Sequence, residues 1–285
     1  MKNQFFHAMK NLSDEEYLDL LCRAEKEPLI NGYKMPGFPD AEIQQVMVGS
    51  AGAQTLSGEG RIFYGIVKKY ASTFKVPIMP DTTILDFGCG FGRMIRFYFK
   101  DIYEENIYGT DVTPSFVDIC KETLHYGSYS VNNPLPPTHY ADDSFDIIYA
   151  YSVFSHLASE VAELWIKELS RILKPNGLLV ATTQSEGFLD YCKILKDDPS
   201  QVTSVWHVAI KDAFSPIEES RRHYRNGEFL YAPTGGGGVL DASFYGEAIV
   251  PKAHIKNIFG RHLTFRAFSF NPSELFQAVF VLQKA

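Results

Sequence analysis

The chain has 285 residues and a formal net charge of −7, and 45% of its residues are hydrophobic. This length suits one large domain, or one domain with insertions, and the apolar content is ample for a packed core. An acidic chain is a poor partner for nucleic acid, which usually requires a basic face. No stretch reaches the ~20 apolar residues of a membrane span, and the first residues lack the apolar run of a signal peptide. We therefore expect neither a nucleic-acid partner nor a membrane partner.

The cysteines and histidines indicate the cellular compartment and argue against a metal site. Four cysteines lie far apart in the sequence, with no C-x-x-C pair: Cys22, Cys89, Cys120 and Cys192. This pattern fits reduced thiols in a cytoplasm better than a disulfide framework or a zinc site. The sequence also has no H-x-x-x-H spacing and no tight carboxylate cluster near a histidine. We expect a cytoplasmic protein with no bound metal.

The N-terminal part is predicted to be helical with one irregular stretch. Ser13 and Glu16 have the spacing of a capping box, which predicts a helix over 14–26 that ends before Pro28. Proline and glycine then predict a loop. The loop is expected over 28–40. Apolar residues at helical spacing after it predict a short helix over 41–48 and a helix over 60–74.

The most informative segment is D-F-G-C-G-F-G over residues 86–92, which follows the apolar pair Ile84 and Leu85. It predicts a buried strand that ends in a tight turn and opens a helix. Its spacing, G-x-G-x-G, differs from the G-x-G-x-x-G of dinucleotide binders. The acid before the first glycine, Asp86, would repel a pyrophosphate but would attract a ligand that carries an ammonium group.

Strands and helices alternate after this motif. The expected segments are 83–87, 92–100, 106–110, 114–125, 128–132, 145–150, 159–173 and 178–184. This alternation predicts an α/β fold with a parallel sheet that is covered on both faces. Two further apolar, alternating segments suit the last two strands, and they lie at 261–270 and 277–283.

The motif and the segments after it, in this order, resemble the class I S-adenosylmethionine-dependent methyltransferases. Asp111 ends the second strand 21 residues after Gly90, which is the length of one helix plus one strand. The resemblance covers residues 58–184 and extends to 250–285. It implies a Rossmann-like seven-stranded sheet with the last strand antiparallel and helices on both faces. It also implies N-terminal helices and an inserted segment before the last two strands.

The same resemblance implies a division of the chain by role. Residues 1–57 would form an N-terminal helical extension, a possible cap over the acceptor. Residues 58–285 would form the methyltransferase domain, in which 185–249 is the variable acceptor-binding segment. The cofactor would be S-adenosylmethionine, which carries both an ammonium and a carboxylate in its methionine part. Backbone N–H groups at a helix start suit that carboxylate.

The resemblance also assigns residues to the cofactor. Asp86 would face the ammonium group, the glycine loop would lie against the methionine carboxylate and the ribose, and Asp111 would hold the ribose hydroxyls. The remaining cofactor-binding candidates are Phe87, Gly88, Cys89, Gly90, Gly92, Val112, Asn132, Tyr151 and Ser152. Other interpretations stay open. The glycine motif could be a turn that binds nothing, Asp111 could cap a helix, and Asn132 could belong to an ordinary Asn-Pro turn.

A second stretch, S-V-F-S-H-L over 152–157, follows a predicted central strand. Together with the proline-rich link at 132–137 it resembles a subgroup of bacterial methyltransferases that act on sugars and other small molecules. His156 either orients its loop through a hydrogen bond or acts as the catalytic base that takes the acceptor's proton.

We therefore predict a methyltransferase that methylates an oxygen atom of a small molecule or saccharide. Two alternatives from other classes are a nicotinamide (NAD(P))-dependent oxidoreductase and a non-catalytic methyltransferase-like binding subunit. The sequence gives no indication of the oligomeric state.

Overall fold

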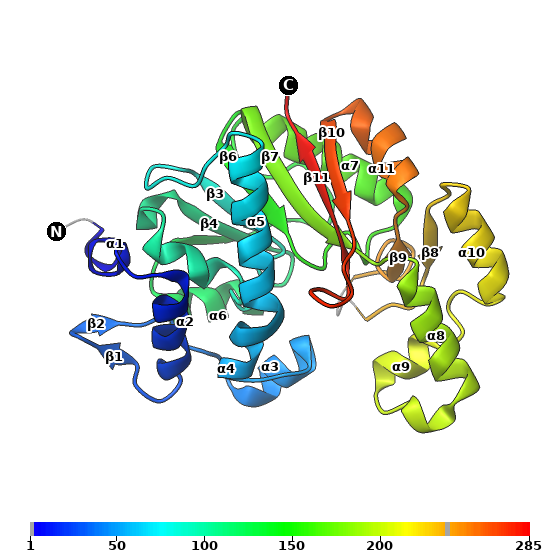
Figure 1. Ribbon diagram of the computed structural model, residues 1–285, viewed down its shortest axis with the longest axis horizontal. Coiled ribbons are helices and arrows are strands. Elements are labelled where there is room, and N and C mark those ends of the chain that lie inside the picture. Colours follow the sequence, from blue (N-terminus) through cyan, green and yellow to red (C-terminus); the bar gives the residue numbers. More distant parts are fainter. Residues whose placement is uncertain (1–2, 237–239) are drawn as a thin grey trace. The chain divides into compact units, whose positions relative to one another are not determined.

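The computed structural model describes residues 3–236 and 240–285 (Figure 1). The chain divides into two compact units, each treated by itself below. The first comprises Met1–Asn133, His139–Tyr149 and Ile172–Leu178, and the second comprises Pro134–Thr138, Ala150–Arg171 and Leu179–Ala285.

One seven-stranded sheet has the order β10-β11-β7-β6-β3-β4-β5. Strand β3 is parallel to β4 and β6, β4 is parallel to β5, and β10 is antiparallel to β11. The strands are β3 (Ile84–Phe87), β4 (Ile107–Asp111), β5 (Ser128–Val131), β6 (Phe145–Ala150), β7 (Leu173–Thr183), β10 (Thr264–Ser269) and β11 (Ala278–Gln283). The predicted α/β fold, with seven strands and an antiparallel last strand, is confirmed.

The register of the first unit's strands places the predicted site residues at one edge. Asp86 of β3 pairs with Tyr149 of β6 and with Gly109 of β4. Asp111, the last residue of β4, pairs with Val131 of β5. Because these strands are parallel, their carboxyl ends meet at the same edge, where open α/β sheets bind ligands.

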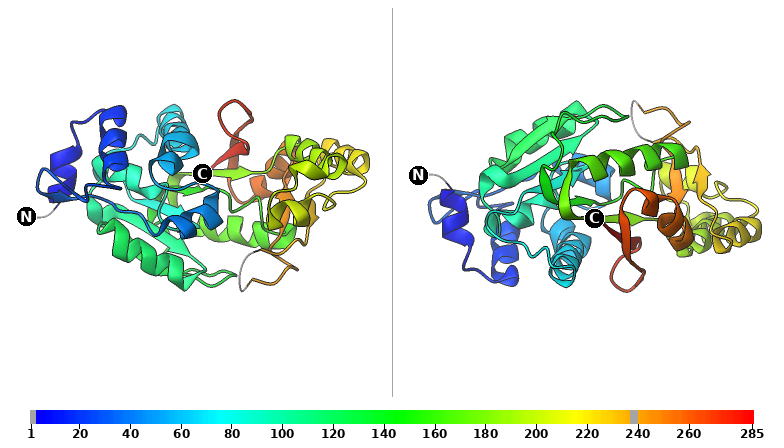
Figure 2. Two further views of the ribbon diagram at one scale, coloured as in Figure 1. Left: turned by 90° about the horizontal axis from the view of Figure 1, so that it is seen from below. Right: turned by 90° about the horizontal axis from the view of Figure 1, so that it is seen from above.

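Helices α5 (Arg61–Thr73) and α6 (Pro114–Leu124) lie on opposite faces of the first unit's strands (Figure 2). The buried residues of α5 are Phe63, Tyr64, Val67 and Ala71, which form the apolar stripe expected of a helix that packs on a sheet. The short helices η2 (Ile95–Lys100) and η3 (Glu104–Asn106) lead into β4. Helix η2 is a 3₁₀-helix and every residue in it is buried.

The predicted helix over 92–100 is therefore wrong at its start. Gly92 has φ +75°, which is left-handed, so a right-handed helix cannot begin there. The predicted strand 178–184 is also longer than expected, because β7 already begins at Leu173. Asn176, with φ +64°, lies in this early part of β7, between the expected helix 159–173 and the expected strand 178–184.

The N-terminal residues contain more structure than the sequence predicted. The elements are α1 (Gln4–Met9), α2 (Asp14–Arg23), β1 (Leu29–Ile30), β2 (Tyr33–Lys34), α3 (Ala41–Val48), α4 (Ala53–Thr55) and the π-helical turn η1 (Leu56–Gly60). Strands β1 and β2 form a hairpin inside the expected loop 28–40. Asn31 and Gly32 both have positive φ, as an Asn-Gly hairpin turn requires, so the expectation of a loop over this stretch is wrong.

Helix α2 is fixed to the rest of the first unit by a cluster of charges. Lys100, only 5% exposed, lies 2.7 Å from a carboxylate oxygen of Asp14 and 2.6 Å from one of Asp101. Lys68 of α5 pairs with Asp14 at 2.9 Å. A buried ammonium group is tolerated only when it is paired in this way. The N-terminal helices are thus part of the first compact unit.

The second unit contains the segment expected to be variable, 185–249, of which residues 237–239 lie outside the described residues. Its elements are α7 (Ser159–Ile172), α8 (Gly187–Asp197), η4 (Pro199–Gln201), α9 (Val205–Ile210), α10 (Ile217–Arg225), β8 (Leu230–Ala232), β9 (Glu247–Ile249), α11 (Lys252–Asn257) and η5 (Phe259–Arg261). A hydrophobic cluster joins α8, α9, α10, β8 and β9 and contains Phe188, Leu189, Cys192, Leu195, Ile210, Phe214, Ile217, Ala232 and Ile249. The inserted segment is a packed structure with its own core.

The capping box at α2 yields a stability prediction. The Ser13 hydroxyl accepts a hydrogen bond from Glu16 N, and Glu16 Oε2 accepts one from Ser13 N at 2.8 Å. We expect Ser13→Ala to destabilise the protein by about 1 kcal/mol in urea unfolding, because a backbone donor loses its partner. Ser273→Ala is the control, because Ser273 is exposed and bonds through its backbone N–H. Equal stability of both variants would mean that α2 does not depend on its cap.

Candidate cofactor and acceptor sites

The glycine motif forms a tight loop at the end of β3. Gly88, Gly90 and Gly92 all have positive φ, between 52° and 80°. A Cβ atom on Gly92 would lie 2.3 Å from Leu124 Cδ1, so the Leu124 side chain of α6 would have to move to admit any other residue. The three glycines are therefore required by the conformation of the loop and by its close packing.

Backbone groups of the loop are bonded to the end of the neighbouring strand β4. Gly88 N and Cys89 N both donate to Thr110 O, at 2.8 and 3.0 Å. Gly90 N donates to the Asp111 carboxylate at 3.0 Å. Gly92 N donates to Cys89 O within the loop. These four amides are already used, so a ligand would meet this part of the loop through close approach rather than through these N–H groups.

Asp86 is a buried carboxyl group with an unused oxygen. It is 2% exposed, and its Oδ2 atom has no hydrogen-bond partner within the described part of the chain. Burial raises the pKa of Asp86 to about 8, and the nearby Tyr149 hydroxyl lowers it in part. That hydroxyl, like Asp86 Oδ2, makes no hydrogen bond of normal geometry with the described residues. Asp111 adds to the effect of burial, and Arg93 opposes it. A cation at this oxygen would stabilise the ionised form.

Asp111 links the glycine motif to the start of α6. Its Oδ2 accepts from Gly90 N and its Oδ1 accepts from Thr113 N, at 3.0 and 2.9 Å. Burial raises the pKa of Asp111, and the bonds from Thr113 and Gly90 offset part of this rise. The N-cap residue of α6 is Thr113, so Asp111 does not occupy the cap position itself. Val112 lies between these two residues and is half-buried.

Asn132 lies directly after β5 and is tied to β4. Its Oδ1 accepts from Thr110 Oγ1 at 2.9 Å, its Nδ2 donates to Asn133 O at 2.8 Å, and its backbone N–H donates to Asp111 O at 3.0 Å. The structure thus brings Asp86, the glycine loop, Asp111 and Asn132 to the carboxyl ends of adjacent strands. All of them belong to the first unit.

Two residues that the sequence did not suggest hold the loop in place. Arg96, fully buried, donates to the backbone carbonyls of Gly92, Gly37 and Phe91, and its guanidinium lies 4.6 Å from the centre of the Phe38 ring. Burial lowers the pKa of Arg96 to about 10. Met47 of α3 lies against Gly90, since a Cβ atom on Gly90 would be 3.2 Å from Met47 Cε. A charged residue within the apolar run 94–99 was the available signal for Arg96.

Three candidates lie in the second unit, where Ser152 and Tyr151 follow β6. Ser152 has φ +60°, which is strained for a residue with a side chain. Its N–H donates to Thr182 Oγ1 at 2.8 Å, and its hydroxyl accepts from Gln277 Nε2 at 2.9 Å. Tyr151 is half-buried. The turn after β6 is therefore held rigidly by β7 and by the residue before β11.

His156, the third of these candidates, is held by the segment that leads into β9. Its Nδ1 lies 2.8 Å from Gly246 O, and its ring stacks on Tyr245 with 5.1 Å between the ring centres. Its Nε2 lies 3.4 Å from Ser152 Oγ. The predicted orienting hydrogen bond is thus present, and the ring still has one nitrogen with no close strong partner.

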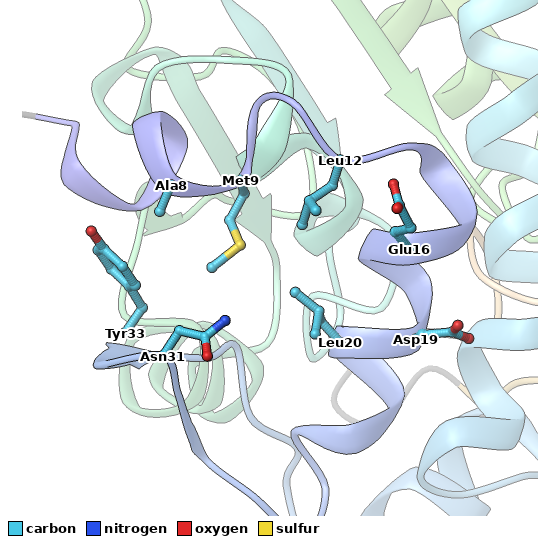
Figure 3. Close-up of a pocket in the computed structure, with 8 residues that line it drawn as sticks. All are labelled: Ala8, Met9, Leu12, Glu16, Asp19, Leu20, Asn31 and Tyr33. Atoms are coloured by element: carbon cyan, nitrogen blue, oxygen red, sulfur yellow. The ribbon is translucent and has the colours of Figure 1, made fainter.

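A separate hollow of about 380 Å³ lies among the N-terminal elements (Figure 3). Met9, Leu12 and Leu20 point toward one another there, and Ala8, Glu16, Asp19, Asn31 and Tyr33 complete the lining. None of these residues is a predicted cofactor-binding residue. Within residues 1–57, Met47 lies near Gly90 of the glycine loop, and Gly37 O accepts a hydrogen bond from Arg96, which also bonds Gly92 O.

Residues 3–236 and 240–285 contain neither a metal-binding cluster nor a membrane-spanning helix. No cluster of three or more His, Cys, Asp or Glu side chains has an arrangement that could hold a metal ion. None of the helices in this part combines the length and the apolar character that a bilayer crossing requires.

Comparison with known proteins gives the family of the central segment. Residues 85–179 match the family model of a methyltransferase domain. Three curated proteins are similar over part of the chain. A 2-methyl-6-phytyl-1,4-hydroquinone methyltransferase of Synechocystis is 32% identical over 35% of this chain. Phosphoethanolamine N-methyltransferase 1 of Arabidopsis thaliana is 27% identical over 42%, and a tRNA N(3)-cytidine methyltransferase of Gallus gallus is 28% identical over 34%.

The matched parts are 31%, 26% and 29% of those three proteins, so the chain spans less than a third of each relative. Two solved structures are similar over nearly their full length. An S-adenosylmethionine-dependent methyltransferase of Clostridium acetobutylicum has a TM-score of 0.52 at 11% identity. The match covers 86% of this chain and 97% of the Clostridium chain. A protein of Pyrococcus horikoshii has a TM-score of 0.50 at 15% identity, with 95% and 99% covered.

At these identities the solved structures establish the fold, and the family model establishes the central segment. Residues 85–179 are a methyltransferase domain, and the chain has the fold of the class I S-adenosylmethionine-dependent methyltransferases.

Proposed function

We propose that the protein transfers a methyl group from S-adenosylmethionine to an oxygen atom of a small-molecule or saccharide acceptor. The observation that carries the proposal is the hydrogen bond from Gly90 N to the Asp111 carboxylate. It joins the glycine motif to the acidic end of the next strand, in a segment that matches a methyltransferase domain. A turn that served only to connect β3 to a helix would need neither this acid nor three glycines.

The residues of the first unit fit the cofactor. The unpartnered Oδ2 of Asp86 suits the ammonium group, because a cation there offsets the cost of burying the carboxylate. We assign Asp111 to the ribose hydroxyls and Asn132 to the adenine. Phe87, Gly88, Cys89, Gly90, Gly92 and Val112 form the surrounding wall. We keep Tyr151 and Ser152 of the second unit as candidates for the methionine part.

When bound, S-adenosylmethionine supplies an activated methyl group: the acceptor oxygen bonds to the methyl carbon while the carbon–sulfur bond breaks, and its electron pair stays on sulfur. The chain has little covalent chemistry left to perform, so its residues chiefly bind and align. His156 is the proposed base, which takes the acceptor's proton at Nε2. We assign the acceptor to the second unit, where His156 and the segment 185–249 lie.

The choice of acceptor rests on weaker support than the choice of cofactor. Two of the relatives are named for small-molecule substrates, a hydroquinone and phosphoethanolamine, which favours a small acceptor. The third is named for tRNA, so nucleic acid is the competing class. The net charge of −7 argues against it. A cytoplasmic location and a reaction without metal remain predictions.

Asp86 yields a prediction in which stability and binding change in opposite directions. Near pH 4 the carboxyl of the native protein is neutral. As the pH rises toward 8 the unfolded chain loses this proton, while the native state keeps it because the native pKa is about 8. Wild type should therefore lose stability over this range relative to Asp86→Asn, by on the order of 5 kcal/mol. Urea unfolding of both proteins at pH 4 and pH 8.5 measures the difference.

The same variant should bind S-adenosylmethionine at least tenfold more weakly in calorimetry, because the ammonium group loses its anionic partner. An Asp86→Asn protein that matches the cofactor affinity of wild type would exclude Asp86 from the site. A stability difference that is constant between pH 4 and pH 8.5 would show that the buried carboxyl does not titrate in this range.

Asp111 yields a second binding prediction. Asp111→Ala removes a charged acceptor from two hydroxyl donors, and such bonds contribute about 1.5–3 kcal/mol each. We expect weaker binding of both S-adenosylmethionine and S-adenosylhomocysteine in calorimetry. Asp118→Ala, on the exposed surface of α6, is the matched control. A folded Asp111→Ala protein with lower stability and full cofactor affinity would restrict Asp111 to its bonds with Gly90 and Thr113.

The acceptor class is tested by incubation with S-adenosylmethionine labelled in its methyl group. Separate reactions contain a pool of hydroxylated small molecules and saccharides, a pool of small amines, and total tRNA. We expect label in the first pool, with the same yield in the presence of EDTA. Label in tRNA alone would reject the proposed acceptor. Tight cofactor binding without transfer to any pool would favour the non-catalytic subunit, and binding of NADH in its place would favour the oxidoreductase.

A further inference from the structure

In the second unit, the loop after β6 lies alongside the segment that enters β9. Gly246 N donates to His156 O at 2.8 Å, Ala248 N donates to Ser155 O at 2.7 Å, and Ala158 N donates to Phe244 O at 3.0 Å. These bonds hold residues 155–158 against residues 244–248. The position of His156 therefore depends on a segment about ninety residues later in the chain.

The partners of the ring define which nitrogen carries the proton. Gly246 O is a carbonyl oxygen and can only accept, so His156 Nδ1, at 2.8 Å from it, carries the hydrogen in the neutral ring. Nε2 is then the nitrogen with the lone pair, and it lies 3.4 Å from the Ser152 hydroxyl oxygen. The stacked Tyr245 ring limits rotation of the imidazole. The ring is thus presented with its basic nitrogen away from the segment that holds it.

A buried carboxylate lies beside the protonated nitrogen. Glu247 has an exposed side-chain fraction of 3%, and its Oε1 lies 3.7 Å from His156 Nδ1. The same oxygen accepts a hydrogen bond from Trp206 Nε1 at 2.7 Å, and Oε2 lies 3.4 Å from Gln184 Nε2. These two donors compensate part of the cost of burying the charge. The carboxylate is thus held in a buried position close to the His156 ring.

Two other titratable groups face this pair. Tyr245 stacks on the His156 ring. Cys192 of α8 faces Glu247; burial raises the pKa of Cys192 to about 12, and the Glu247 charge adds to this. The Cys192 thiol is therefore neutral at physiological pH. The negative charge that acts on His156 from these contacts is therefore that of Glu247.

We propose that Glu247 is a positioning residue, which stabilises the imidazolium formed when His156 accepts a proton at Nε2. In that step the acceptor's O–H bond breaks, the proton moves to Nε2, and the electron pair stays on the oxygen that is methylated. The imidazolium later releases the proton to water. The transfer of the acceptor's proton to His156 rests on the proposed function. The stabilisation of protonated His156 by Glu247 does not.

This inference gives the inserted segment a second task besides shaping an acceptor site. Trp206 of α9 and Glu247 of β9 both come from residues 185–249, and together they deliver a charge to the ring of His156. The side chain of Trp206 is 40% exposed, so the pair reaches from the surface to a buried position.

The test uses the full-length protein without cofactor or acceptor, with ¹⁵N-labelled histidine. Ring ¹⁵N resonances report which nitrogen carries the proton and what fraction of the ring is protonated at a chosen pH. We expect wild-type His156 to carry its neutral-ring proton on Nδ1. In Glu247→Gln the ratio of protonated to neutral ring at pH 6.5 should fall about tenfold, and Glu247→Asp should restore most of it.

Glu228→Gln is the matched control, because Glu228 lies 2.6 Å from His223 in the same unit. It should change the protonated fraction of His223 and leave that of His156 unchanged. If Glu247→Gln does not fold, Trp206→Phe replaces it. Loss of the indole donor leaves the carboxylate charge less dispersed, so the protonated fraction of His156 should rise.

A folded Glu247→Gln protein with an unchanged His156 ratio would overturn the proposal. A wild-type ring with its proton on Nε2 would do so too, whatever the variants show. Neither result depends on methyl transfer. Failure to find an acceptor would instead count against the proposed function alone.

Discussion

The glycine loop depends on its hydrogen bonds to the end of β4. Thr110 O accepts hydrogen bonds from two loop amides, and the Asp111 carboxylate accepts a hydrogen bond from a third. A loop of three left-handed glycines has high conformational freedom in the unfolded chain, so it needs such bonds to adopt one shape. Because β4 supplies them, the loop and the acid at the end of the next strand form one rigid structure. The proposed cofactor site is thus pre-organised by backbone bonds.

Two buried charges show how the first unit combines stability and binding. Arg96 has carbonyl and aromatic partners, so its charge is solvated by the protein and it ties the glycine loop to Gly37. Asp86 has no such compensation at Oδ2. A buried group without a partner is costly, and such costs concentrate at functional sites. This contrast supports our proposal that Asp86, rather than Arg96, is the group that a ligand would complete.

The second unit follows the same logic over a longer sequence distance. Ser152, in a strained conformation, is held by Thr182 and Gln277, and His156 is held by Gly246. Both residues follow β6, yet every one of these partners comes from a later part of the chain. The inserted segment therefore acts on the residues after β6 by contact.

The sequence by itself determined the elements whose signals are local. The capping box predicted the start of α2, and the alternation of segments predicted the sheet. The spacing from Gly90 to Asp111 predicted two strands joined by a helix; the strands are parallel, and their connection contains the 3₁₀-helix η2. The Asn31-Gly32 pair is a further local signal, for the turn between β1 and β2. These features depend on residues a few positions apart, or on one helix and one strand, so composition and spacing are enough.

The tertiary structure alone decided which side chains share a site. The burial of Arg96, the contact of Met47 with Gly90 and the carboxylate of Glu247 beside His156 all join residues that are distant in sequence. It also decided that Asp86 is neutral over much of the pH range, because burial depends on how the whole unit packs around the end of β3. Such contacts leave no local pattern, since any residue of suitable size and polarity at those distant positions would look the same in the sequence.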